Sequence, residues 1–362
     1  MNRGESVLIT GAGGCIGSAL AEKIAKSGAR RLILLDHAEH ELHEITLALS
    51  AINGCAPHVA VLGDICDASL LAEVFKEHRP DVIYHAAAFK HVPIVEENPL
   101  AAIRNNVLGT MTLVRTAREY ESAQLVMIST DKAVNPRSVM GVSKRIAELV
   151  LLRWNGIKTQ MKAVRLSNVL GSRGSVAPRF MQQIARGGPV TVTHPGVSRY
   201  FVTLREAVDV ILATENLEGS VFVCDPGEPV KIVDLARGMI RKAGFQPDVE
   251  MQIAFTQLLP GEKLSEEMTF AGETVEPTGQ AGIQRVRGAA LAVDKFDAEM
   301  ARLIESVEGR DLVALVEALV RMVPAYEPSE ELFRMLSSSR AVATPGDTIA
   351  KAAKAGASSR TP

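Results

Sequence analysis

Short apolar runs alternate with amphipathic stretches over the first 171 residues, and this alternation restricts the fold more than any other feature of the chain. We expect buried strands at residues 6–10, 31–35, 58–62, 81–85, 125–129 and 162–166. Helical patterns lie between them, at residues 18–27, from about 39, and at 68–78, 98–120 and 139–155. Alternation of this kind is typical of parallel βαβ units. The sequence therefore predicts an α/β fold built on a doubly wound parallel sheet.

The pattern changes after about residue 171, where loops lengthen and prolines become frequent. We expect the sheet domain over residues 1–171, with later segments returning to the sheet, and a smaller substrate-binding region over residues 172–336. Residues 337–362 hold seven alanines, five serines and no aromatic residue. Such a stretch cannot bury enough apolar surface to fix a conformation, so we expect a disordered tail there, with a short alanine-rich helix as the alternative.

The composition excludes several classes of function. Lys and Arg total 40 against 42 Asp and Glu, and 4% of residues are aromatic, which argues against a nucleic-acid partner. The four cysteines form no CxxC pair and no cluster with histidine, so we expect neither a metal site nor a disulfide framework. No run reaches the roughly 18 apolar residues of a membrane span, and the amino-terminal stretch lacks the apolar core of a signal peptide. We therefore expect a soluble, cytoplasmic protein.

A glycine-rich turn follows the first expected strand and opens the first expected helix. Gly11, Gly14 and Gly17 stand in TGAGGCIG, with Cys15 and Ile16 between the last two. Glycines at such positions allow a tight turn, the approach of a pyrophosphate to the backbone and close packing of helix on strand. The helix N-terminus adds amide donors and the positive end of a dipole. We therefore predict a dinucleotide site of the Rossmann type at this turn.

The end of the second expected strand bears on which dinucleotide binds. Asp36 can accept a hydrogen bond from a ribose 2′-hydroxyl and would repel a 2′-phosphate, which favours NAD. NADP stays open, because four residues near Asp36 in the sequence could offset a phosphate: Arg30, Arg31, His37 and His40.

Further cofactor contacts are expected after the third and fourth strands. Asp64 and Ile65 follow the third strand, where Asp64 would face the adenine; the alternative is an ordinary turn or N-cap aspartate. Ala86 and Ala87 follow the fourth strand and are small where a cofactor must pass. The glycine spacing TGxxGxxG resembles that of the extended short-chain dehydrogenases/reductases, a class that carries a YxxxK pair.

In this chain the YxxxK pair is replaced by Met140 and Lys144, four residues apart on one face of an expected helix. Thr130, Asp131 and Lys132 come at the carboxyl end of the fifth expected strand, the edge at which open α/β sheets carry their chemistry. Asp131 and Lys132 could act as an acid–base pair, or form a surface salt bridge. A thioether cannot move a proton, so Met140 either lines the site or is core packing in a binding-only protein.

The segment STDKAVNPRSVMGVSKRIAE, residues 129–148, resembles the CapD-like polysaccharide biosynthesis family of UDP-N-acetylglucosamine 4,6-dehydratases. Five other segments are similar to that family: FKHVPIVEENP, NNVLGT, RLSNVLGSRGSVAP, GEPVKIVDLA and LPGEKLSEEM. The resemblance spans roughly residues 5–270 and extends to members with methionine in place of the tyrosine. It implies a Rossmann-type sheet with a smaller C-terminal substrate domain.

The resemblance implies a lyase reaction in which sugar C4 is oxidised, water leaves across C5 and C6, and hydride returns to C6. NAD, or NADP, would then be retained and recycled in each turnover. The family roles make Asp131 the acid for the C6 hydroxyl and Lys132 the base for C5, with Thr130 at the C4 oxygen and Lys144 on the nicotinamide ribose. Because Met140 replaces the tyrosine, the C4 hydroxyl proton must pass to Asp131 or through water to Lys144.

The implied partner is a UDP-sugar, and the positions that would hold it are Lys90, His91, Asn168, Arg173, Ser175, Val176, Arg199 and Glu262. The two arginines are candidates for the diphosphate, because a chain with balanced net charge needs local cations there. Each charged residue taken alone could equally be a solvated surface group. The resemblance also implies a homo-oligomer formed through helices that flank the sheet.

Two other functions stay open at this point. One is a nucleotide-sugar 4-epimerase on the same fold, which the Asp131–Lys132 pair disfavours because epimerisation needs no base at C5; a 5,6-elimination is a near variant of the dehydration. The other is a non-catalytic dinucleotide-binding protein, which Met140 suggests. Turnover of a UDP-sugar would separate these functions.

Overall fold

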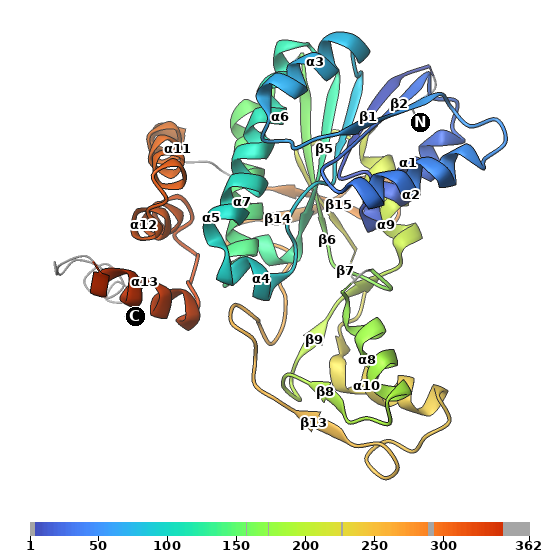
Figure 1. Cartoon of the computed structure of the whole chain (residues 1–362), viewed down its shortest axis with the longest axis vertical. Helices are drawn as coiled ribbons and strands as arrows, with labels where there is room; N and C mark the ends of the chain where they lie inside the picture. Colours follow the sequence, from blue (N-terminus) through green and yellow to red (C-terminus); the bar gives the residue numbers. More distant parts are fainter. Residues whose placement is uncertain (1–3, 157, 173, 226, 289–292, 343–362) are drawn as a thin grey trace.

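The computed structural model describes residues 4–156, 158–172, 174–225, 227–288 and 293–342, and a nine-stranded sheet forms its centre (Figure 1). The strand order is β14-β15-β11-β6-β5-β4-β1-β2-β3. The strands from β11 to β3 are parallel, and β15 and β14 extend the β11 edge in antiparallel pairing. The sheet strands are β1 (Ser6–Thr10), β2 (Arg31–Asp36), β3 (His58–Leu62), β4 (Val82–His85), β5 (Gln124–Thr130), β6 (Gln160–Leu166), β11 (Val221–Cys224), β14 (Thr274–Pro277) and β15 (Ile283–Arg287).

The doubly wound parallel sheet predicted from the sequence is confirmed. β1 and β3 have the predicted bounds, and the other four predicted strands differ by at most two residues at an end. β1, β4 and all of β5 before Thr130 are buried, because helices cover the sheet on both faces. Continuous apolar runs are the sequence signature of strands in this setting.

The helices form one layer on each face of the sheet. α1 (Cys15–Ala25), α2 (Glu39–Ser50) and α9 (Leu204–Thr214) lie on one face, and α3 (Ala68–His78), α6 (Thr110–Glu119) and α7 (Val139–Trp154) lie on the other (Figure 1). Every residue of α7 from Val139 to Leu151 is buried. A helix buried all round needs a second layer outside it, and the C-terminal helices supply that layer.

The helix predicted over residues 98–120 is interrupted. α5 (Pro99–Ile103) runs into a π-helical turn over Arg104–Gly109, and α6 follows. In this turn the Asn106 amide oxygen accepts from the Phe89 N–H at 2.8 Å, and its nitrogen donates to the Phe89 carbonyl at 3.0 Å. Tertiary contacts to the loop after β4 therefore accompany the break, which helical periodicity does not reveal. Such π-turns are frequent at functional sites.

A smaller unit lies at the carboxyl edge of the parallel strands, at the bottom of Figure 1. α8 (Val176–Ala185) and α10 (Ile232–Lys242) pack there around a core that includes Phe180, Ile240 and Met251. Short strand pairs complete the unit: β8 (Val190–Val192) with β13 (Ile253–Phe255), β9 (Ser198–Arg199) with β12 (Val230–Lys231), and β7 (Asn168–Val169) with β10 (Phe201–Val202).

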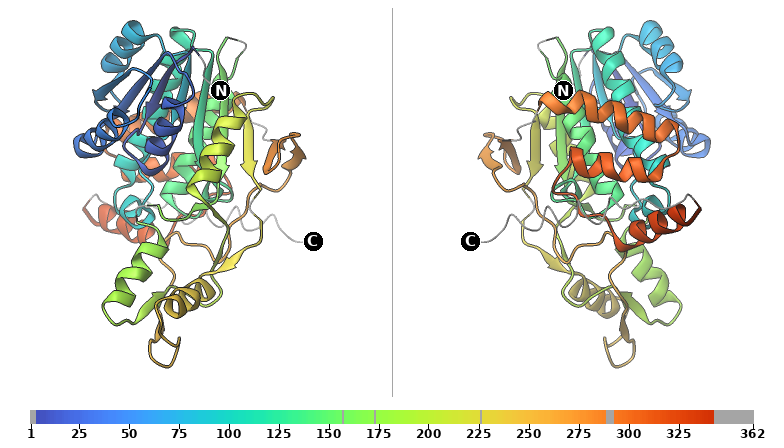
Figure 2. Two further views of the ribbon diagram at one scale, coloured as in Figure 1. Left: turned by 90° about the vertical axis from the view of Figure 1, so that its right-hand side faces the viewer. Right: turned by 90° about the vertical axis from the view of Figure 1, so that its left-hand side faces the viewer.

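The C-terminal helices do not belong to the smaller unit, although the sequence placed most of them in a substrate-binding region over residues 172–336. α11 (Val293–Glu308), α12 (Leu312–Met322) and α13 (Glu330–Val342) lie outside α4 (Val92–Glu97), α5 and α7 (Figures 1 and 2). Their buried side chains, such as Leu303, Leu315 and Leu319, share one core with α7.

The expected tail, residues 337–362, also begins differently. α13 continues to Val342, so residues 337–342 are helical, because its earlier side chains Leu332 and Leu336 are buried in the core beneath it. The rest of the expected tail, residues 343–362, lies outside the described residues. Within the described part of the chain, no helix is long and apolar enough to cross a membrane.

Candidate active site

A cleft of about 1060 Å³ opens where the carboxyl ends of the parallel strands meet the smaller unit. Its walls include Gly11 after β1, Ala86 after β4 and Thr130 at the end of β5 on the sheet side, and Val176 and Arg199 on the other. Ligands of doubly wound sheets bind at this edge. The cleft is therefore the candidate site.

The glycine turn is packed too closely for any side chain. Gly11 has φ +68°, and a Cβ there would lie 2.6 Å from the Ala87 nitrogen. A Cβ on Gly17 would lie 2.0 Å from the Gly11 carbonyl oxygen, and Gly14 ends the turn at the start of α1 without a side-chain cap. The first amides of α1 are thus left for an anion at the helix N-terminus. The turn fits the pyrophosphate of a dinucleotide.

Asp36 is buried at the carboxyl end of β2, next to this turn. Its carboxylate accepts the Gly13 N–H at 2.9 Å and the Ala38 N–H at 3.0 Å. The two arginines that could have offset a 2′-phosphate lie at the opposite end of β2. Arg30 binds Asp81 at 3.0 Å and Arg31 contacts His78 at 3.3 Å.

The remaining predicted cofactor residues divide into two groups. Cys15, Ile16, Ile65, Ala86 and Ala87 line the cleft. Asp64 is exposed and does not line it. Its carboxylate accepts the Cys66 N–H at 2.9 Å. Asp64 is therefore an ordinary turn aspartate, which was the alternative to a contact with adenine.

Lys144 and Met140 lie one turn apart on α7 and both line the cleft. The Lys144 ammonium donates to the Ile128 carbonyl at 2.9 Å. Burial lowers the pKa of Lys144 to about 8, although Glu148 opposes this shift. α7 begins beside the catalytic candidates because Ser138 caps it, accepting the Gly141 N–H at 3.0 Å.

Thr130, Asp131 and Lys132 form one hydrogen-bonded cluster at the end of β5. The Asp131 Oδ1 accepts from the Thr130 hydroxyl and from the Lys132 ammonium, each at 2.9 Å. The Asp131 side chain is 0% exposed, and its Oδ2 has no hydrogen-bond partner among the described residues. The pair is therefore not a solvated surface salt bridge. Thr130 and Lys132 line the cleft, whereas Asp131 lies directly behind them.

Lys132 keeps its charge in this environment. Burial opposes the charge most strongly, but Asp131 and Glu266 together outweigh burial, so the pKa of Lys132 is raised. A lysine that removes a proton must first be neutral. Lys132 must therefore lose a proton before it can act as a base.

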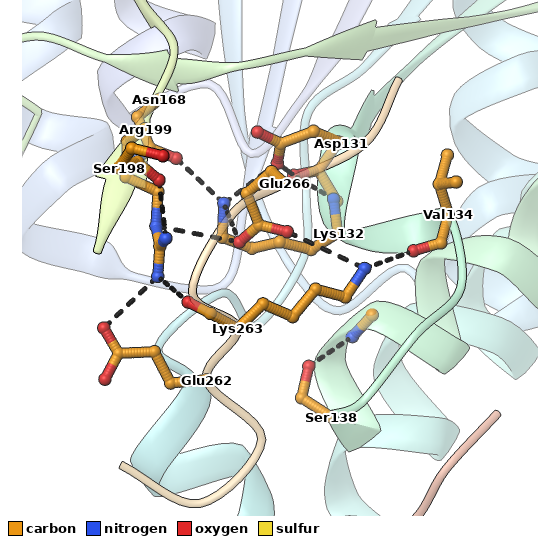
Figure 3. A network of polar contacts seen from close by, with 12 residues as sticks. Asp131, Lys132, Val134, Ser138, Asn168, Ser198, Arg199, Glu262, Lys263 and Glu266 are labelled. Atoms are coloured by element: carbon orange, nitrogen blue, oxygen red, sulfur yellow. Dashed lines mark hydrogen bonds and ion pairs between the residues drawn. The ribbon is translucent and has the colours of Figure 1, made fainter. Parts of the chain in front are cut away.

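Glu266 is the principal residue that the sequence reasoning missed. Its carboxylate lies 3.4 Å from the Lys132 nitrogen, 3.7 Å from the Arg199 Nε and 3.9 Å from the Lys263 nitrogen (Figure 3). The segment that carries it reaches β5 because Gly261 packs directly on Ser138. The resemblance in LPGEKLSEEM was the available signal, but it did not separate Glu266 from its neighbours.

The predicted substrate residues surround the same cleft, with one outside the described residues. Those that line it are Lys90, His91, Asn168, Ser175, Val176, Arg199 and Glu262. Arg173 lies outside the described residues. Asn168 accepts from the Lys132 ammonium at 2.8 Å, so it belongs to the catalytic cluster as well.

The guanidinium donors of Arg199, which was predicted to bind the diphosphate, already have partners within the protein. Its guanidinium donates to Glu262 at 3.2 Å and to the carbonyls of Ser198, Lys263 and Leu264. An anion would have to exchange with these partners. Across the described ranges, no cluster of three or more His, Cys, Asp or Glu side chains has the arrangement of a metal site.

The fold and the cleft are those of a Rossmann-type protein, with a doubly wound parallel sheet and a ligand-sized cleft at its carboxyl edge. The chain belongs to the family described as "Polysaccharide biosynthesis protein", which matches residues 7–287. It is 49% identical over 274 residues to the capsular polysaccharide biosynthesis protein CapD of Staphylococcus aureus, and 43% identical over 277 residues to the probable polysaccharide biosynthesis protein EpsC of Bacillus subtilis. These matches cover 74% and 75% of this chain and 46% of each relative, so the chain spans about half the length of these curated relatives. The resemblance to the CapD-like polysaccharide biosynthesis family is confirmed.

Solved structures share the fold. Pen from Bacillus thuringiensis matches with a TM-score of 0.68 and 26% identity, over 74% of this chain and 84% of that one. A UDP-glucose 4-epimerase of Thermus thermophilus in complex with NAD matches with a TM-score of 0.62 and 24% identity, over 73% and 90%. The dTDP-glucose 4,6-dehydratase DesIV from Streptomyces venezuelae matches with a TM-score of 0.64 and 21% identity, over 73% and 88%.

Proposed function

We propose that this protein catalyses the 4,6-dehydration of a UDP-N-acetylhexosamine, UDP-N-acetylglucosamine first among them, with a retained NAD. The observation that carries the proposal is the hydrogen-bonded cluster at the end of β5, in which Thr130 and Lys132 line the cleft and the buried Asp131 lies behind them. Elimination across C5 and C6 needs both an acid and a base, and this cluster supplies one of each. A 4-epimerase needs neither at C5.

The cofactor is assigned from the residues that fit it. The turn at Gly11, Gly14 and Gly17 would take the pyrophosphate, Asp36 the adenosine ribose, and Lys144 the nicotinamide ribose. When bound, NAD supplies a hydride acceptor for C4 and a hydride donor for C6. Two solved relatives of the same fold, an epimerase and a dehydratase, are described with NAD bound.

The first proton leaves the sugar C4 hydroxyl. Thr130 is the proposed acceptor, since its own hydroxyl hydrogen already points to Asp131 Oδ1 at 2.9 Å. The C4 proton would pass to the Thr130 oxygen as the Thr130 proton passes to Asp131, which becomes a neutral carboxylic acid. This relay needs no acid–base group at Met140 and leaves Asp131 holding the proton that the next step uses.

The elimination then uses both members of the pair. Lys132 first releases its ammonium proton to water. As a neutral amine it then takes the C5 proton and becomes an ammonium again, while the C6–O bond breaks and the leaving hydroxyl takes the proton from Asp131 to form water. After hydride reaches C6, Lys132 returns a proton to C5. Two protons are released by the sugar and two are consumed, so the cluster ends each turnover in the state in which it began.

Proton NMR of the purified protein with UDP-N-acetylglucosamine in heavy water tests the proposal. A new C6 methyl signal with deuterium at C5 is expected, and its loss in Lys132→Ala would place the elimination at this cluster. A sugar that returns with only C4 inverted would establish the epimerase instead. Bound NAD without turnover of any UDP-sugar would establish a binding protein.

A further inference from the structure

Glu266 is a buried carboxylate for which the proposed reaction has no step. Its side chain is 2% exposed, and it does not line the cleft. One oxygen, Oε1, faces the Lys132 ammonium and the Arg199 guanidinium. The other, Oε2, has no hydrogen-bond partner among the described residues and meets Lys263 as an ion contact at 3.9 Å. A carboxylate buried in this way requires cations around it.

The geometry places Glu266 and Asp131 as two carboxylates around one ammonium (Figure 3). Asp131 is fixed on the sheet at the end of β5, whereas Glu266 arrives on the segment over residues 259–268. Lys263 anchors this segment by donating to the Val134 carbonyl at 2.7 Å. Lys132 is therefore held between the sheet and a segment that also contacts Arg199 of the smaller unit.

We propose that Glu266 is the positioning residue of the acid–base pair: it holds Lys132 in the charged, resting form and so limits when the pair can perform elimination. This inference rests on the proposed function, because only an elimination makes the neutral form of Lys132 necessary. Glu266 does not line the cleft, and it acts on the sugar only through its ion contact with the Lys132 nitrogen.

The charges around Lys132 determine the direction of the effect. Asp131 and Glu266 favour its ammonium form, whereas burial and the Arg199 guanidinium disfavour it. Asn168 accepts a hydrogen bond from the ammonium and carries no charge. Removing the charge of Glu266 leaves one carboxylate against burial and Arg199, so Lys132 gives up its proton at lower pH.

The first experiment reads the protonation of Lys132 directly and needs no turnover. The protein is labelled with lysine carrying ¹³C at Cε, the Lys132 signal is assigned with Lys132→Arg, and its chemical shift is followed from pH 6 to 11. In Glu266→Gln the titration is expected to move to lower pH by about one unit or more. Glu267→Gln is the matched control, since its carboxylate is exposed and bonds Asn135 instead.

The second experiment reads the pH dependence of deuterium incorporation at C5. The rate is expected to rise with pH as Lys132 loses its proton, and Glu266→Gln should reach half of its maximum at lower pH than the wild type and Glu267→Gln. Glu266→Asp keeps the charge, so its half-maximal pH should stay close to that of the wild type. If Glu266→Gln does not fold, a large change of this pH in folded Glu266→Asp would contradict the role of the charge.

The outcomes separate this inference from the proposed function. An unmoved Lys132 titration in folded Glu266→Gln would overturn the role of Glu266, whatever the enzyme does to a sugar. If the wild type turns over no UDP-sugar although Glu266→Gln shifts the Lys132 titration, the proposed reaction is overturned, and with it the need to limit elimination. If Glu266→Gln and Glu267→Gln shift the Lys132 titration equally, the cause is a general change in charge rather than the Glu266 contact, and the inference is also overturned.

Discussion

Two cleft lysines differ in how readily they keep their charge, although burial disfavours the ammonium form of both. Burial disfavours the ammonium form of Lys144 more than Glu148 favours it, so the pKa of Lys144 falls to about 8. Lys132 is also largely enclosed, but Asp131 and Glu266 raise its pKa. The residue type is the same, so the difference lies in how many carboxylates each ammonium meets.

Lys144 gives a prediction about cofactor binding. If its ammonium holds the nicotinamide ribose, NAD affinity should fall as pH rises through about 8, because the group is protonated below that pKa and neutral above it. Calorimetric titration with NAD between pH 7 and 9.5 measures this. Lys144→Met should bind weakly at every pH in that range, and a flat wild-type affinity would contradict the role.

Gly17 gives a prediction about the turn. A methyl group at Gly17 would lie 2.0 Å from the Gly11 carbonyl, so Gly17→Ala must displace the pyrophosphate turn and should weaken NAD binding by at least about tenfold, or 1.4 kcal/mol. Gly238 on α10 is the control, because no atom beyond its neighbouring residues and its own helix backbone lies within 4 Å of its added methyl. Gly238→Ala should leave NAD affinity unchanged and raise the unfolding free energy by about 0.5–1 kcal/mol. Equal NAD affinities of the two variants would refute this account.

At the scale of elements, the start of α7 is held by the C-terminal segment. Glu96, at the end of α4, accepts the Val139 N–H at 2.5 Å and the Ser329 hydroxyl at 2.6 Å. Glu327 also donates its N–H to the Pro136 carbonyl at 3.0 Å. The loop between Lys132 and Met140 is thereby held by the C-terminal segment as well as by the segment over residues 259–268.

Ser329→Ala tests this contact. Loss of a buried hydrogen bond to a charged group should lower the unfolding free energy by about 1.5–3 kcal/mol, measured by urea denaturation. Ser337→Ala, which removes an exposed hydroxyl on α13, should change it by less than about 0.5 kcal/mol. If the two serines cost the same, Ser329 does not support α7 through Glu96.

At the scale of the whole molecule, α11 and α12 cover the outer face of the sheet domain (Figure 2). They lie beyond residue 287, where the family match ends. The homo-oligomer expected through helices flanking the sheet therefore cannot use the part of α7 that these helices bury. The homo-oligomer itself remains a prediction, which a molar-mass measurement in solution tests.

A pair of substitutions on α12 tests how much this cover contributes. Leu315 is fully buried, and Leu315→Asp would place a charge in the shared core, so a loss of about 4 kcal/mol or more and association of the exposed face are expected. Val320 is 36% exposed on the same helix, and Val320→Asp should change the unfolding free energy by less than about 0.5 kcal/mol. Thermal melting with light scattering measures both. Native-like melting of Leu315→Asp would show that the cover is dispensable.

The sequence by itself determined the features that depend on local chemistry. Short apolar runs predicted six of the seven parallel strands in the described sheet, and glycine spacing predicted the tight turn after β1, because both are imposed within a few residues by backbone geometry. The order Thr130, Asp131, Lys132 also predicted an acid next to a cation at the active edge, and the structure brings these side chains together.

Only the tertiary structure decided what lies around that cluster. Glu266 and Lys132 are far apart in the sequence, and their contact exists because Gly261 lets one segment pack on Ser138. The break in the helix at Asn106 and the helical cover on α7 likewise depend on partners that no local pattern specifies. Charge states follow the same rule, since burial and long-range pairing, rather than residue type, determine whether a lysine in this cleft keeps its proton.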